Sequence, residues 1–180
     1  VILWGDSCIT RARQPVFLSR VLRRKGFFPT RRIRSRLYPD LCGSRAFALA
    51  DHQIAHIYVK TADDIAAVRE SVEGLSGVDT IEPAQNGASR RSGDLILTAS
   101  PGAWFSYKWW DSNREAPDYA RHMDIHNKIG FDPCELFLGW PPLSVSLNDL
   151  RVRGTHGRTD TPTAYATDID LPRPPHSPMQ

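Results

Sequence analysis

The sequence RAFALADHQIAHIYV spans residues 45–59 and decides the fold, because it sets two short runs of strand-forming residues around a polar break. Residues 46–50 are apolar, and residues 54–59 combine β-branched and aromatic side chains, a composition typical of strands. Asp51-His52-Gln53 joins the two runs. The stretch therefore predicts two strands connected by a short polar segment.

The residues around this stretch predict further strands and helices. A helix follows it, because Thr61 and Asp64 have capping-box-like spacing and apolar residues recur at helical intervals up to Leu75. Other strands are expected at residues 1–4, 78–81, 94–98 and 103–109, and other helices at 15–25 and 117–123. Strands and helices mix along the chain, so the class is α/β or α+β.

Three segments lack a regular pattern. Residues 29–39 are basic and are expected to be irregular, and residues 124–142 form a loop rich in Gly and Pro. The proline-rich tail, residues 168–180, is expected to be disordered, which leaves residues 1–167 as one domain. The apolar run at residues 1–4 is expected inside a sheet with neighbours on both sides, so neighbouring strands are expected upstream.

Composition narrows the class of protein. The chain has 180 residues, of which 41% are hydrophobic and 24% charged, and no apolar run approaches the roughly 20 residues of a membrane helix. The three cysteines are far apart and odd in number, which favours neither a disulfide framework nor a cysteine-based zinc site. A reducing, cytoplasmic setting is expected.

Positive charge is concentrated near the start of the chain, although the net charge is only +3. Two interpretations are open. The cluster can attract phosphates or nucleic acid, or it can be the solvated face of a helix and a loop, which is the simpler interpretation. The residues concerned are Arg11, Arg13, Arg20, Arg23, Arg24, Lys25, Arg31, Arg32, Arg34 and Arg36.

Potential metal ligands occur in the first half of the chain. Asp6 follows the opening strand, and ligands of α/β sheets bind outside the carboxyl ends of strands, although a loop aspartate or a helix cap would look the same. Asp51 and His52 point to opposite faces if the strand is regular, so both meet one metal only if the chain bends there. The alternative is a hydrogen-bonded turn.

Two more candidates lie in the second half. His156 is flanked by Gly154 and Gly157, which allow close approach to an ion, and neutral imidazole is a good zinc ligand. Arg158 could add a charge-assisted bond to a phosphate, but a flexible surface loop explains this stretch equally well. His126 follows Asp124 by two residues, so the two can share an ion or be surface residues. The aromatic side chains between residues 104 and 110 suit a core better than a base-stacking platform.

Taken together, residues 45–59, 102–110, 124–128, 131–137 and 152–158 are similar to stretches of bacterial nucleotide pyrophosphatase/type I phosphodiesterase-like proteins. This family belongs to the alkaline phosphatase superfamily. The resemblance covers most of residues 1–158. It implies the C-terminal part of an alkaline-phosphatase-like α/β sandwich, with a mixed sheet flanked by helices.

The resemblance also implies a two-metal centre, usually zinc, that cleaves a small phosphate ester or nucleotide. His156 matches the late His-Gly ligand of the family. Asp6 falls where an Asp-His-Gly motif is usual, but the next residue is Ser7, so His52 or His126 is expected to replace the missing imidazole. A position of His52 more than about 6 Å from both Asp6 and His156 would contradict this hypothesis.

The family's nucleophile and early ligands precede the region that this sequence resembles. No Thr or Ser here matches the nucleophile motif, so an N-terminal half is expected to be missing and the chain alone is expected to be inactive. Two alternatives are a basic nucleic-acid-binding module, which is the less favoured partner assignment, and an inactive fragment without a biochemical role.

Overall fold

The computed structural model describes residues 1–5, 7–84, 92–121, 137–138 and 145–168. Its largest sheet is antiparallel and has the strand order β6-β7-β9-β8. The strands are β6 (Ala46–Asp51), β7 (Ile54–Val59), β8 (Val78–Pro83) and β9 (Leu95–Ala99). The two strands predicted from residues 45–59 are therefore confirmed, and they pair without a shift from Ala46↔Val59 to Asp51↔Ile54.

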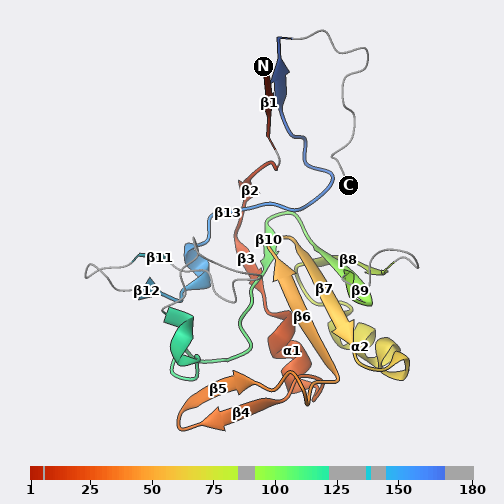
Figure 1. The fold of residues 1–180 in the computed structure, drawn as a ribbon, viewed down its shortest axis with the longest axis vertical. Helices are drawn as coiled ribbons and strands as arrows, with labels where there is room; N and C mark the ends of the chain where they lie inside the picture. Colours follow the sequence, from red (N-terminus) through yellow and green to blue (C-terminus); the bar gives the residue numbers. More distant parts are fainter. Residues whose placement is uncertain (6, 85–91, 122–136, 139–144, 169–180) are drawn as a thin grey trace.

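Two helices cover this sheet. They are α1 (Leu18–Arg24) and α2 (Ile65–Val72), and a 3-10 turn, η1 (Ala62–Asp64), leads into α2. Val68 and Val72 of α2 and Leu22 of α1 are fully buried, as the helical spacing requires. Burial of each such side chain contributes about 1.5–3 kcal/mol. The helices contact each other, and α1 contacts β6 (Figure 1).

A parallel pair connects the start of the chain with its middle. β3 (Gln14–Val16) runs beside β10 (Ala103–Phe105). The chain then leaves the sheet, so the strand predicted for residues 103–109 ends at Phe105. Trp104, Phe105, Trp109 and Trp110 are each at most 5% exposed, which confirms their assignment to the core.

Short strand pairs complete the described fold. They are β1 (Ile2–Trp4) with β14 (Tyr165–Thr167), β2 (Thr10–Arg11) with β13 (Gly154–Thr155), β4 (Thr30–Ile33) with β5 (Arg36–Pro39), and β11 (Phe137–Leu138) with β12 (Val145–Ser146). Two 3-10 turns are η3 (Asp118–Arg121) and η4 (Asp149–Arg151). The mixture of strands and helices confirms the α/β class. Within the described part of the chain, no helix is long and apolar enough to cross a membrane.

Three sequence predictions are wrong in detail. Residues 29–39 form the β4–β5 hairpin, whose exposed arginines hide the alternation that normally marks a strand. The helix predicted from residue 15 begins at Leu18, because residues 14–16 pair with β10. β1 does not lie inside a sheet: in the described residues its partner is β14, and Ile2 and Leu3 are 56% and 65% exposed. Residues 169–180 lie outside the described residues.

Candidate metal centre

The centre of the candidate site is the two-residue turn between β6 and β7. Asp51 and Ile54 are paired, so His52 and Gln53 make the turn. His52 has a φ of 53°, a left-handed conformation in which histidine is enriched among non-glycine residues. Such backbone conformations persist where the surrounding structure fixes them, and they are frequent at functional sites.

Hydrogen bonds fix this turn from three sides. The backbone N–H of Phe105 donates to the carbonyl oxygen of His52 at 2.7 Å, and the N–H of Ala99 donates to the carbonyl oxygen of Gln53 at 2.8 Å. The N–H of Gln53 donates to the carbonyl oxygen of His156 at 2.9 Å. The turn is therefore tied to β9, to β10 and to the segment after β13.

The approach of His156 depends on its neighbours in the chain. Gly154 and Thr155 pair with Arg11 and Thr10 of β2, which carries the next residues toward the turn. Gly157 has a φ of 120°, and a Cβ added there would lie 3.4 Å from the backbone nitrogen of Gln53. A glycine at this position thus permits the close passage of the two segments.

These constraints bring the imidazole rings of His52 and His156 together. Their centroids are 4.1 Å apart, and the ring planes are inclined by 41°. The separation meets the distance condition set for His52 from the sequence. Neutral imidazoles are good ligands for zinc, and a catalytic zinc site uses three protein ligands, of which this pair would supply at most two.

The other predicted ligands are not part of this pair. Asp51 ends β6 with an exposed side chain. Asp6 and His126 lie outside the described residues, and their assignment stays a prediction. Among the residues that the structure describes, no group of three or more His, Cys, Asp or Glu side chains could hold a metal ion.

Arg158 is held by protein groups. Its guanidinium donates to Asp160 at 2.9 and 2.7 Å, to Asp79 at 2.7 Å, and to the carbonyl oxygen of Ala99 at 2.6 Å. The hydrogen bonds that Arg158 donates to Asp160 and Asp79 raise the pKa of Arg158. A phosphate would have to displace these carboxylates from the guanidinium, so this arrangement does not favour a phosphate contact. The contact between Arg158 and a phosphate stays a prediction.

The Arg158–Asp160 pair predicts a pH effect. The hydrogen bond from Arg158 lowers the pKa of Asp160 below 3.8, so the pair stabilises the folded chain above that pH and loses this effect as the pH falls through the lower value. We expect Arg158→Met to lower the free energy of unfolding at pH 7, and the difference from the native chain to shrink at a pH below the lowered pKa of Asp160. Urea unfolding at both pH values measures this, and a difference that grows in acid would contradict it.

Two polar residues of the site have no counterpart in the sequence analysis. Gln53 is fully buried, and its amide nitrogen lies 3.3 Å from the carbonyl oxygen of Ala103. Thr155 is 1% exposed, and its hydroxyl has no hydrogen-bond partner in the described structure. The sequence does not reveal that Gln53 and Thr155 are buried beside the two histidines, because their burial depends on segments that are distant along the chain.

Five of the ten residues of the basic stretch form ion pairs in the described structure, with three carboxylates between them. Asp111 forms ion pairs with Arg20, Arg23 and Arg24 at nitrogen–oxygen distances of 3.2, 2.5 and 2.6 Å. Arg31 pairs with Asp40 and Arg32 with Glu115. These partners favour the interpretation of a solvated, structural surface over one that attracts polyanions.

Comparison with known proteins gives two structural neighbours. No family model matches the chain, and no curated protein matches it. Phosphonoacetate hydrolase from Sinorhizobium meliloti 1021 in complex with phosphonoacetate is similar to 98% of this chain, with 13% identity and a TM-score of 0.45. The same enzyme with phosphonoformate is similar to 66%, with 12% identity and a TM-score of 0.39. The chain spans 38% and 29% of those chains, and at these values the likeness assigns neither a family nor an activity to it.

Proposed function

We propose that this chain carries part of the metal centre of a phosphoric ester hydrolase, of the phosphodiesterase or nucleotide pyrophosphatase type. The observation that supports this most is the contact between the rings of His52 and His156. Both residues were singled out as metal ligands from the sequence, and they come from segments far apart along the chain. A bound zinc or similar divalent ion would supply Lewis-acid chemistry toward the phosphate.

The chain's own residues would hold and orient this ion. The His52 ring sits on a turn whose backbone is bonded to Phe105, and the His156 backbone is bonded to Gln53. Rigid positioning of this kind limits the rearrangement that ligand binding requires. Asp6 and His126 remain the proposed source of further ligands, and the proposed substrate is a small phosphate ester or nucleotide.

The proposal is tested by metal binding. We expect the chain to bind Zn²⁺ in a titration against a chromogenic chelator, with shifts of the His52 and His156 imidazole resonances in NMR spectra. His52→Ala and His156→Ala should each weaken Zn²⁺ binding by more than about tenfold, because each removes one imidazole ligand and water is a weaker ligand for zinc.

A third histidine provides the matched control. His56 lies in β7, and its Nδ1 lies 3.0 Å from the carbonyl oxygen of Ser92, so it has a separate structural partner. His56→Ala should bind Zn²⁺ like the native chain. Equal loss in all three variants, or no loss in the first two, would overturn the assignment of the metal to the His52–His156 pair.

We further propose that this chain alone does not turn over substrate, because none of its Thr or Ser residues matches the nucleophile motif that the resemblance implies. Incubation with bis(nitrophenyl) phosphate and Zn²⁺ should release no nitrophenol above the rate of free metal. Hydrolysis that depends on His52 and His156 would contradict this part while supporting the metal site.

A further inference from the structure

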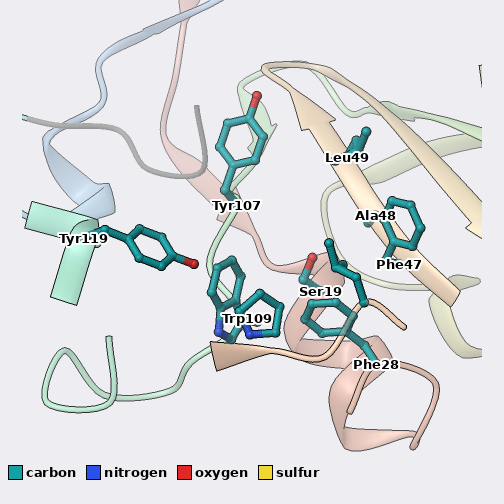
Figure 2. Close-up of a pocket in the computed structure, with 10 residues that line it drawn as sticks. Ser19, Phe28, Phe47, Ala48, Leu49, Tyr107, Trp109 and Tyr119 are labelled. Carbon is teal, nitrogen blue, oxygen red and sulfur yellow. The ribbon is translucent and has the colours of Figure 1, made fainter. Parts of the chain in front are cut away.

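A cavity lies beside β6, the terminal strand of the four-stranded sheet, and its walls are mostly aromatic. Its volume is about 300 Å³. Phe28, Phe47, Tyr107, Trp109 and Tyr119 contribute rings to it, and none of the lining residues is charged (Figure 2). This cavity is a site of its own, and it does not depend on the proposed metal centre.

The rings of the wall are held by contacts with one another and with residues outside the cavity. The indole N–H of Trp109 donates to the carbonyl oxygen of Leu37 at 3.1 Å, and its ring meets that of Phe28 edge-to-face at 6.2 Å. Phe47 stacks on Tyr58 with a centroid distance of 5.0 Å and an interplanar angle of 9°. A wall held in this way is preorganised, so a ligand would not have to order it.

Ser19 presents a hydroxyl to this largely apolar space, and Tyr107 and Tyr119 carry the other hydroxyl groups of the lining. Ser19 of α1 is only 5% exposed, and Figure 2 shows its hydroxyl directed away from the helix toward the cavity. None of the hydrogen bonds between described residues involves this hydroxyl. A ligand with one hydrogen-bonding group could bond this hydroxyl in place of solvent, and such a hydrogen bond contributes about 0.5–1.5 kcal/mol net.

Size and chemistry together define the ligand. A dry apolar cavity of about 150 Å³ holds benzene, so roughly twice that volume suits two fused rings. Aromatic walls favour a flat aromatic molecule, which can pack offset or edge-to-face against them. The absence of charge in the lining excludes a charged ligand, because an unpaired charge is costly to bury.

We propose that this cavity binds a neutral bicyclic aromatic molecule that carries a single hydrogen-bonding group. Ser19 accepts or donates that hydrogen bond, and the rings of Phe28, Phe47 and Trp109 enclose the ligand. Side chains at the mouth, among them Leu49, set the space that remains for it.

Indole is a suitable probe, and calorimetric titration of the whole chain tests the proposal. Indole should bind saturably at one site with a negative heat-capacity change, which marks apolar burial. Leu49→Trp should fill the cavity and weaken binding by more than about tenfold. Ser19→Ala should weaken it about two- to tenfold, the value of one hydrogen bond.

Two controls distinguish specific binding in the cavity from non-specific adsorption of indole. Leu150→Trp adds the same side chain at a position that is 64% exposed and not part of the cavity, so indole affinity should not change. Indole-5-sulfonate, which is anionic, should bind much more weakly than indole. The proposal is overturned if indole does not bind saturably, if Ser19→Ala and Leu49→Trp both bind like the native chain, or if the sulfonate binds equally well.

Discussion

Replacement of Lys108 by methionine is expected to lower the free energy of unfolding by about 3–5 kcal/mol, the usual cost of breaking a buried ion pair. Lys108 is 5% exposed, and its ammonium group donates to Asp149 at 2.5 Å and to the carbonyl oxygen of Leu147. Among the described residues, the Asp149 carboxylate would retain the hydrogen bond from the Ser106 hydroxyl at 2.8 Å. Urea unfolding followed by circular dichroism measures the loss.

Two further variants isolate the cause. Lys108→Met combined with Asp149→Leu should recover most of the lost stability, because no unpaired charge then remains buried. Lys60→Met removes an exposed lysine and should stay within about 0.5 kcal/mol of the native chain. A Lys108→Met variant as stable as Lys60→Met would show that the pair does not anchor this part of the fold.

Gly93→Ala is expected to be almost as damaging, with a loss of about 3 kcal/mol in the free energy of unfolding. A Cβ at this position would lie 2.7 Å from the carbonyl oxygen of Ile57, a backbone atom of β7 that also accepts the N–H of Asp94 at 2.8 Å. The φ of 71° adds a steric penalty of about 1–2 kcal/mol for any side chain. The clash and the penalty together account for the loss.

Gly26→Ala is the matched control for this substitution. Gly26 has a φ of 81°, but a Cβ there would meet no atom within 4 Å. Its cost should therefore be about 1–2 kcal/mol, the backbone penalty alone. The interpretation fails if both glycine variants lose the same stability in thermal or urea unfolding.

The sequence predicts the central sheet better than it predicts the outer strands. The strand predicted for residues 54–59 has the same ends as β7. The segment consists largely of β-branched and aromatic residues that favour strands, and it contains no Gly or Pro that would interrupt them. The β4–β5 hairpin carries no such signal. Arg31, Arg32 and Arg36 are exposed, and Leu37 is the buried member of this hairpin, so it resembles a basic loop in sequence.

The candidate site could be predicted in part. His156 and His52 stand out because each lies in a short polar segment, and their proximity in the structure agrees with the hypothesis that they share an ion. The left-handed backbone of His52 and the burial of Gln53 could not be predicted. Both depend on Phe105, Ala99 and His156, which approach the turn from distant parts of the chain.

The bond from the Gln53 N–H to the His156 carbonyl oxygen also bears on the order of folding. This bond closes a loop that contains β7, α2, β8, β9 and β10, and contacts so distant along a chain form slowly because loop closure costs entropy. We therefore expect the two imidazoles to meet late in folding. A metal ion bound by both histidines would cross-link the β6–β7 turn to the segment after β13. Because it binds the folded chain, it would raise the free energy of unfolding.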